Sequence, residues 1–190
     1  ILVYNSTPFR GLDILLDLFP LINKEIPELK LYIFSCLKTY QIDLKDDENR
    51  YLYEKSKRMN NVQYFGSVSQ PDLARYMKEA ITLTYPNSFH ETSCIAIMEA
   101  MSSGCNIVSS KIGALPETCA GFATLIDGFP GSAEYNNSFI SEVISSYYQI
   151  QNHLEENIQK KLVEQIIFCR DNYTWSIRAN QWINWLNQYK

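Results

Sequence analysis

The 190-residue sequence lacks the features that identify several common classes of protein. Its formal net charge is −4 and it contains no basic tract, so the sequence argues against nucleic-acid binding as its main function. No apolar run approaches the roughly 20 residues that a membrane-spanning helix needs. No basic region followed by an apolar core stands at its start, so we expect neither a signal peptide nor a transmembrane segment.

Phosphate-binding and metal-binding signatures are missing as well. No G-x-G-x-x-G follows the first predicted strand, which leaves NAD binding with little support, and no G-x-x-x-x-G-K-[ST] occurs. The five cysteines are odd in number and lack C-x-x-C spacing. They predict buried or free thiols in a reducing compartment rather than disulfides or a zinc site. Acidic residues within Lys38–Arg50 have no second ligand cluster beside them, so we interpret that segment as a solvated loop and expect no metal.

Short apolar runs alternate with helical patterns over most of the chain. The runs are rich in β-branched and aromatic residues and do not alternate strictly with polar residues, which is typical of parallel strands covered on both faces. The predicted strands are Ile1–Tyr4, Leu29–Ser35, Val62–Phe65, Ile81–Tyr85, Asn106–Ser109 and Ala123–Leu125. The predicted helices between them are Gly11–Ile22, Asp47–Arg58, Pro71–Glu79 and Ser93–Ser103. This alternation predicts an α/β fold with a Rossmann-like, doubly wound parallel sheet of about six strands.

The pattern changes after Gly128–Gly131, where helical segments follow one another. They run from about Asn137 to Gln149 and from His153 to Arg170, with His153 expected on a helix surface. A last helix follows Thr174 and contains the three tryptophans of the chain, Trp175, Trp182 and Trp185. We therefore expect C-terminal helices appended to the sheet.

The most informative segment contains two glutamates eight residues apart. Glu91 falls in a loop after a strand that Pro86 ends, and Glu99 is predicted two turns into the next helix. Eight helical positions span about 12 Å at roughly 1.5 Å rise per residue. That length is on the order of the distance from the ribose to the hexose of a nucleotide sugar. The intervening helix N-terminus favours an anion such as pyrophosphate, so this segment is predicted to bind a nucleotide sugar along its length.

Four motifs in order resemble those of a known family. Glu91–Glu99 resembles the E-x7-E signature of retaining glycosyltransferases with the GT-B fold (glycosyltransferase group 1, family 4-like). Ile112–Glu117 resembles the G-G-x-P-E turn of that family, and Asn61–Val68 resembles its N-V-x-F-x-G-x-V strand. Phe9–Leu16 resembles its K-G-x-x-x-L-L opening. One pair of glutamates at this spacing is common by chance, whereas four motifs in the order of the family are specific.

The resemblance implies the donor-binding, C-terminal half of a GT-B enzyme. Residues 1–190 would form the nucleotide-sugar domain, and the amino-terminal acceptor domain would be absent from this chain, a piece of a longer polypeptide. The implied reaction transfers a hexose from a UDP- or GDP-linked sugar to an acceptor hydroxyl with retention, without a metal or other cofactor. We expect a cytoplasmic protein whose isolated domain turns over little or nothing. The terminal helix would cross onto the missing domain.

The resemblance assigns roles to three charged residues. Glu91 would accept hydrogen bonds from hydroxyls of the donor sugar, and Glu99 would accept them from the ribose. Arg10 would neutralise the leaving diphosphate, where the family has a lysine. The alternatives are a loop acid for Glu91, a solvent-facing helix acid for Glu99 and a surface arginine for Arg10. The neighbours of Glu99 are mostly apolar, however, so its carboxylate needs partners.

The phosphate contacts depart from the family pattern. Thr92, Ser93, Cys94 and Ile95 stand where the family usually has E-G-F-G, and this chain has neither glycine. Backbone N–H groups and two hydroxyls would bind the pyrophosphate instead, unless Ser93 is simply an N-cap. Asn5 stands where the family often has a second cation, which halves the positive charge.

The remaining candidates lie at the predicted nucleobase end and around the site. Ser67 and Val68 fall where the family binds the base through its backbone, or they form an ordinary loop. Gly113–Glu117 is interpreted as structural, and His90 as a bystander. Two other functions stay open. The missing glycines and Asn5 favour an inactive nucleotide-sugar-binding module, and the aromatic terminal helix favours an interaction scaffold.

Overall fold

The six strands form one all-parallel sheet. The computed structural model describes residues 1–151 and 156–189, so the predicted helical position of His153 lies outside the described residues. The strand order is β3-β2-β1-β4-β5-β6, which confirms the predicted doubly wound parallel sheet. The strands are β1 (Leu2–Tyr4), β2 (Leu31–Ile33), β3 (Val62–Tyr64), β4 (Thr82–Tyr85), β5 (Asn106–Ser110) and β6 (Thr124–Ile126).

The chain reverses its winding direction at the centre of the sheet. It runs outward from β1 to β3, then returns to place β4 on the other side of β1, with Leu2 opposite both Leu31 and Thr82. The helices that follow β1 and β4 at this switch point lie on opposite faces of the sheet, which leaves a crevice at the carboxyl ends of the two strands. The fold therefore places the residues that follow Tyr4 and Tyr85 around one crevice.

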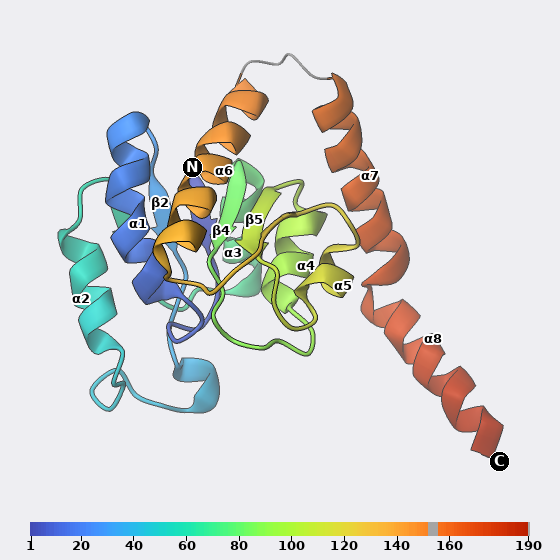
Figure 1. The fold of residues 1–190 in the computed structure, drawn as a ribbon. Coiled ribbons are helices and arrows are strands. Elements are labelled where there is room, and N and C mark those ends of the chain that lie inside the picture. Colours follow the sequence, from blue (N-terminus) through green and yellow to red (C-terminus); the bar gives the residue numbers. More distant parts are fainter. Residues whose placement is uncertain (152–155, 190) are drawn as a thin grey trace.

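Helices cover both faces of the sheet. Helices α1 and α6 pack against each other on one face, and α4 lies on the other beside α3, α5 and α7 (Figure 1). The central strands are buried on both sides, and Leu2, Val3 and Tyr4 are at most 1% exposed. The helices are α1 (Leu12–Glu25), α2 (Arg50–Arg58), α3 (Gln70–Glu79), α4 (Ile95–Ser102), α5 (Leu115–Cys119), α6 (Ala133–Gln151), α7 (Glu156–Asn172) and α8 (Trp175–Leu186).

Local sequence explains where several helices begin and end. Ser69 caps α3 by accepting a hydrogen bond from the Asp72 backbone N–H, and Pro71 occupies the first turn, where its missing N–H costs nothing. Helix α4 ends at Ser102, and Gly104, just beyond its C-cap, has a φ of +77° and takes the left-handed conformation that the sequence predicted.

Other boundaries differ from the sequence predictions. Helix α2 begins at Arg50 instead of Asp47, and the interpretation of Asp47 as part of a solvated loop is wrong, because this side chain is buried. Its carboxylate accepts hydrogen bonds from the Tyr53 hydroxyl (2.6 Å) and the Asn49 backbone N–H (2.8 Å). Asp47 is therefore a structural residue that fixes the start of α2. Helix α5 was not predicted.

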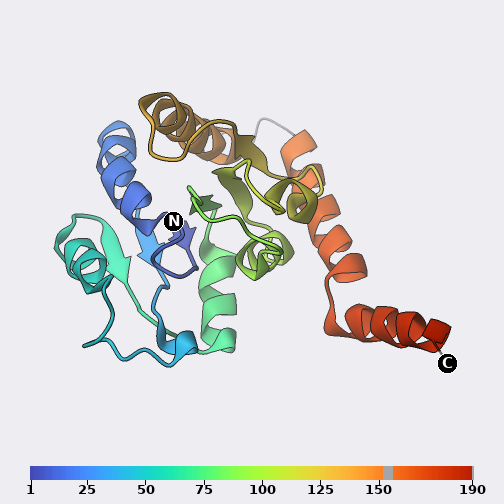
Figure 2. The ribbon, with the colours of Figure 1, turned by 60° about the horizontal axis from the view of Figure 1, so that its bottom comes forward.

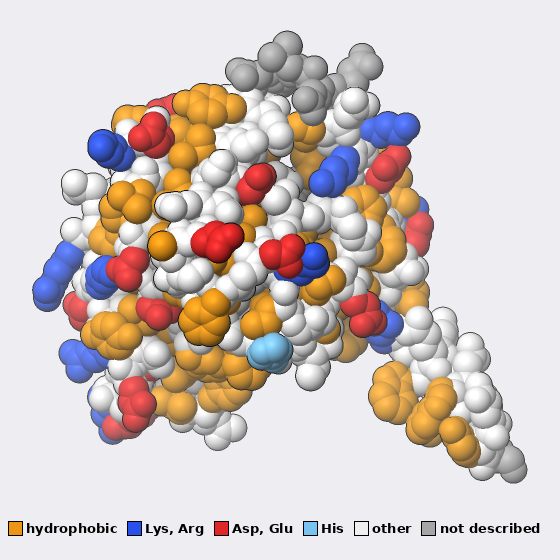
Figure 3. Space-filling view, in the orientation of Figure 1, with side chains coloured by type: hydrophobic (Ala, Val, Ile, Leu, Met, Phe, Trp, Pro, Cys, Tyr) orange, Lys and Arg blue, Asp and Glu red, His pale blue; other side chains and the backbone are white. Residues whose placement is uncertain are grey.

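The last helix projects from the body of the domain. Helix α7 packs on α4, whereas α8 extends away from the sheet (Figure 2) and has no buried residue. Hydrophobic side chains gather on this projecting segment (Figure 3), and Trp175, Trp182 and Trp185 are 85%, 62% and 48% exposed. Of the helices that the structure describes, none combines the length and the apolar character needed to cross a bilayer.

Candidate functional site

A cleft of about 650 Å³ lies at the carboxyl ends of the central strands. Its walls come from the segments that follow β1, β2, β3 and β4 and from the first turns of α3 and α4. All but one of the predicted site residues line it, namely Asn5, Arg10, Ser67, Val68, Glu91, Thr92, Ser93, Ile95 and Glu99. Cys94 is the exception, because its side chain is buried behind the cleft wall. The two glutamates thus lie in the same cleft, as the nucleotide-sugar hypothesis requires.

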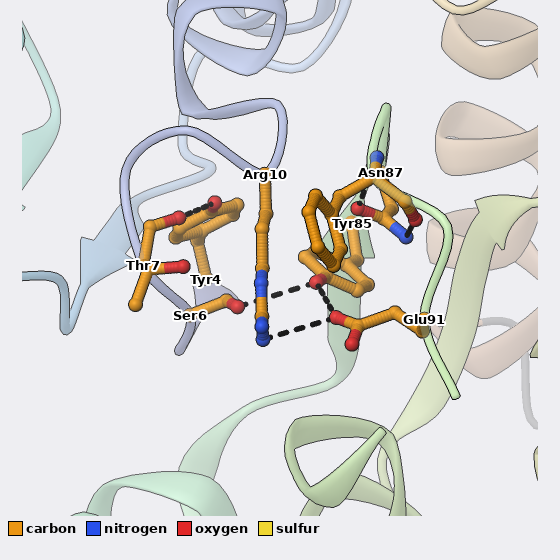
Figure 4. A network of polar contacts seen from close by, with 8 residues as sticks. Tyr4, Ser6, Thr7, Arg10, Tyr85, Asn87 and Glu91 are labelled. Atoms are coloured by element: carbon orange, nitrogen blue, oxygen red, sulfur yellow. Dashed lines mark hydrogen bonds and ion pairs between the residues drawn. The ribbon is translucent and has the colours of Figure 1, made fainter. Parts of the chain in front are cut away.

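Glu91 is a buried carboxylate held by two donors (Figure 4). Its Oε1 lies 3.1 Å from Arg10 Nη1 and accepts a hydrogen bond of 2.9 Å from the Tyr85 hydroxyl. Only 6% of Glu91 is exposed, so these partners offset the free energy that burial of an ionised group costs. The Ser6 hydroxyl lies 3.2 Å from that of Tyr85 and extends the network.

Arg10 forms an ion pair with Glu91 and is not an isolated surface arginine. It lies in the turn before α1, which begins at Leu12. Its guanidinium lies 5.0 Å from the centre of the Phe89 ring and 5.5 Å from that of Phe9, within the range of cation–π attraction. The side chain is 22% exposed, so the guanidinium is available to the cleft while it pairs with Glu91.

Two glycines allow the loops of the site to approach closely. A Cβ at Gly11, with φ +98°, would lie 2.0 Å from the Pro86 carbonyl oxygen. A Cβ at Gly113, with φ +57°, would lie 2.8 Å from both the backbone N and O of Glu91. The next residue, Ala114, donates its N–H to the Glu91 carbonyl at 2.9 Å. Gly113 and Ala114 thus hold the Glu91 backbone, which supports the structural interpretation of the Gly113–Glu117 segment.

Glu99 lies one turn into α4, not two as predicted, because the helix begins later than expected. Its Oε2 accepts a hydrogen bond of 3.1 Å from Asn5 Nδ2. Burial raises the pKa of the Glu99 carboxyl, and hydrogen bonds from Gln70 and Asn5 act against that shift. The expected need of this carboxylate for partners is met by amides, and Asn5 binds Glu99 instead of supplying a charge.

The N-terminus of α4 lies between the two glutamates. Cys94 is the N-cap, so the interpretation of Ser93 as the cap is wrong, and Thr92 and Ser93 are exposed in the preceding loop. The first backbone N–H groups of a helix have no partner within it, and here they belong to residues from Ile95 onward. Burial raises the pKa of the Cys94 thiol to about 11, which keeps it protonated at neutral pH.

The other end of the cleft is formed after β2 and β3. Gly66 has a φ of +68°, and Ser67 and Val68 follow it into the cleft wall. Phe34 also lines the cleft, and its ring stacks on that of Phe65 with centroids 4.8 Å apart. These aromatic rings give this end a firm apolar wall. Within residues 1–151 and 156–189, no cluster of three His, Cys, Asp or Glu side chains is placed to hold a metal ion.

Several lining residues were not among the sequence predictions. They are Ser6, Thr7, Phe34, Ser35, Cys36, Tyr40, Gln70, Leu73, Phe89 and Ala96, together with Tyr85 directly behind the cleft. Most follow the ends of strands β1, β2 and β4, so their positions directly after predicted strands could have indicated that they line the cleft. His90, interpreted as a bystander, also lines the cleft.

Comparisons with known proteins agree with this architecture. The chain is 29% identical over 175 residues to the poly(glycerol-phosphate) alpha-glucosyltransferase of Bacillus subtilis (strain 168), and the match covers 87% of this chain and 23% of that protein. Sucrose-phosphate synthase from Thermosynechococcus elongatus has the same fold, with a TM-score of 0.73 at 17% identity over 99% of this chain and 45% of that one.

A third comparison is with Alr3699/HepE of Anabaena in complex with UDP-glucose. The TM-score is 0.69 at 18% identity, over 98% of this chain and 48% of that one. The present chain thus spans about a quarter of its Bacillus relative and less than half of these two solved structures.

The family comparison covers all six strands of the sheet and the helices as far as the start of α7. The family described as glycosyl transferases group 1 matches residues 2–161, a range that contains every predicted site residue. The chain therefore belongs to the glycosyl transferases group 1 family.

Proposed function

We propose that this chain is the donor-binding domain of a retaining hexosyltransferase that uses a nucleoside diphosphate sugar. The observation that carries this proposal is the position of Glu91 and Glu99 in one cleft, on either side of the N-terminus of α4. The Bacillus relative is a glucosyltransferase, and the Anabaena structure holds UDP-glucose, which supports a hexose donor. The acceptor domain would lie outside this chain, since the chain spans only part of its relatives.

The charges in the cleft suit a leaving diphosphate. Negative charge builds up on the diphosphate as its bond to the sugar breaks, and preorganised donors stabilise that charge. Arg10 and the first backbone N–H groups of α4 are such donors. Glu91 would orient the sugar, whose transition state is cation-like, and Glu99 would bind the ribose. The chain's own residues perform these steps, and the proposal needs no metal or other cofactor.

Arg10 and Asn5 also support a second candidate, a catalytically inactive nucleotide-sugar-binding module. Arg10 already pairs with Glu91, and Asn5 supplies an amide to Glu99 in place of a second cation. Such a module would bind donor in the same cleft without transferring the sugar. We also propose a reducing, cytoplasmic environment, supported by the free thiols of all five cysteines, four of them buried.

Calorimetric titration tests the proposed donor site. UDP-glucose, GDP-mannose, UDP and GDP are titrated into the chain and into Glu99→Ala. We expect either the UDP ligands or the GDP ligands to bind. Glu99→Ala should lower the affinity for both the nucleotide and its sugar conjugate by roughly tenfold, because hydrogen bonds to a charged group are lost. Absence of binding in both series would refute the proposal. Transfer of the sugar by the full-length enzyme, assayed with the same donors, separates the enzyme from the inactive module.

A further inference from the structure

We propose that Tyr85 is a positioning residue for Glu91, holding one carboxylate oxygen so that the other is left for a hydroxyl of the donor sugar. This inference rests on the proposed function, because it assigns a sugar contact to Glu91. Tyr85 lies at the end of β4, and its hydroxyl is 2.9 Å from Glu91 Oε1 (Figure 4). It would act through Glu91 and not by touching the donor.

The direction of the hydrogen bonds follows from chemistry. An ionised carboxylate only accepts, so the Tyr85 hydroxyl donates its hydrogen to Glu91 Oε1. The Tyr85 oxygen is then left to accept from the Ser6 hydroxyl, 3.2 Å away. A directed chain from Ser6 to Tyr85 to Glu91 results. Burial raises the pKa of Tyr85, which keeps the hydroxyl protonated as a donor at neutral pH.

The ring of Tyr85 has little freedom to move. The residue is 0% exposed, and its ring meets that of Tyr4 edge to face with centroids 5.8 Å apart. Its carbonyl accepts a hydrogen bond of 2.7 Å from Ser109 Oγ on the neighbouring strand β5. The donor to Glu91 is thus carried by a central strand of the sheet and not by a loop. Precise sites depend on support of this kind.

The two oxygens of Glu91 have different surroundings. Oε1 receives both Arg10 and Tyr85, whereas no protein group hydrogen-bonds to Oε2 in the part of the chain that the structure describes. Because Glu91 lines the cleft, its uncommitted oxygen is the one left for a ligand. Arg10 alone would leave the carboxylate less well oriented, since its side chain is 22% exposed and must also meet the diphosphate. Tyr85 supplies the second fixed point.

The test compares nucleotide sugar with nucleotide in matched variants. UDP-glucose and UDP (or GDP-mannose and GDP, whichever series the chain binds) are titrated into wild type, Tyr85→Phe, Glu91→Ala and the double variant. Tyr85→Phe keeps the buried ring and removes only the hydroxyl. We expect it to lower the affinity for the nucleotide sugar by about three- to tenfold, as the loss of one hydrogen bond to a charged group would. The affinity for the nucleotide should change by less than about twofold.

The double variant isolates the action through Glu91. On the Glu91→Ala background, Tyr85→Phe is expected to cause no further loss, because no carboxylate remains to be positioned. A comparable loss on both backgrounds would overturn the inference and indicate a structural role. The matched control is Tyr135→Phe, which removes another buried hydroxyl, 2.6 Å from Ser110 Oγ and outside the cleft. It is expected to change neither affinity.

Failure of this inference differs from failure of the proposed function. If neither nucleotide series binds wild type, the proposed function fails and the inference fails with it. If Glu91→Ala lowers the affinity for the nucleotide sugar but not for the nucleotide, and Tyr85→Phe changes neither, the proposed donor site is supported and only the role of Tyr85 is wrong. Melting temperatures of all variants, measured in parallel, show whether any loss of binding comes from partial unfolding.

Discussion

Glu91 and Glu99 have different kinds of partner in the cleft. Glu91 is paired with a cation and a hydroxyl, whereas Glu99 accepts a hydrogen bond from the amide of Asn5. Loss of one partner of a buried ion pair leaves an uncompensated charge and costs more than the loss of one hydrogen bond. The two acids should therefore respond differently to loss of their partners.

Glu99 should make the stability of the domain depend on pH. Burial raises its pKa in the folded state, so the unfolded chain releases this proton first and folding becomes less favourable as pH rises through the raised pKa. Glu99→Gln removes the charge and keeps an oxygen for Asn5. We expect the variant to melt at a higher temperature than wild type at pH 7 and at nearly the same temperature at pH 4. An equal difference at both pH values would contradict the prediction.

Removal of Arg10 should destabilise the domain as well as weaken donor binding. Arg10→Ala leaves the buried Glu91 with Tyr85 as its remaining partner. Loss of one partner of a buried ion pair costs about 3–5 kcal/mol, and the partial exposure of Arg10 lowers the expected value to about 1–3 kcal/mol. Urea unfolding measures it. The control is Lys55→Ala, which breaks an exposed pair with Asp17 and is expected to cost less than about 1 kcal/mol.

At the scale of elements, the loop before α5 supports the loop before α4. A Cβ added at Gly113 would lie 2.8 Å from both the backbone N and the backbone O of Glu91, and Ala114 donates its N–H to the Glu91 carbonyl. The turn that resembles the G-G-x-P-E motif thus acts on the site through the backbone of another loop. A side chain at Gly113 would therefore push the two loops apart at Glu91.

Gly113→Ala is therefore expected to cost more than an equivalent change elsewhere. The control is Gly121→Ala, because Gly121 has a φ of +84° but no atom within 4 Å of an added Cβ. In both variants, alanine in the left-handed conformation lowers the free energy of unfolding by about 1–2 kcal/mol. Gly113→Ala adds the clash with Glu91, so we expect a larger loss of unfolding free energy in urea and weaker binding of the nucleotide sugar. Equal losses for the two variants would show that the contact with Glu91 is unimportant.

The strands were the elements that the sequence predicted best, because their apolar composition follows from their burial. The apolar runs that become the central strands β1, β4 and β5 are buried on both faces, and their pattern shows it. The start of α4 was misplaced because neither Ser93 nor Cys94 makes a side-chain cap, and α5 is only five residues long, too short for a clear period. The burial of Asp47 and the bond between Tyr85 and Glu91 depend on tertiary contacts, which no local pattern carries.

At the scale of the whole molecule, the domain consists of a packed α/β body and a projecting helix. The cleft lies in the body, and α8 contributes no buried residue. The three tryptophans of the sequence all lie in this helix and are exposed. They form an apolar surface of the kind that marks an interaction site. The expected contact of this helix with an acceptor domain stays a prediction.

The wavelength of tryptophan emission should consequently change little when the α/β body unfolds, because the tryptophans are already exposed. We expect the emission maximum of the chain to shift little between buffer and high urea, while circular dichroism reports a cooperative loss of helix. Trp182→Phe, which leaves two exposed tryptophans, serves as a control and should lower the intensity without changing the maximum. A large red shift on unfolding would show that α8 is covered in solution.

The strand order also determines when the cleft can exist during folding. Asn5 and Arg10 follow β1, whereas Glu91 and Glu99 come more than eighty residues later, so the two halves of the cleft meet only once β4 has docked beside β1. Contacts between residues so distant in the chain form slowly, because a long loop must close first. An intermediate holding only β1, β2 and β3 would lack the half of the cleft that contains Glu91 and Glu99. The proposed donor site would therefore be complete only after β4 has paired with β1, and during synthesis on the ribosome it could not form before α4 has been made.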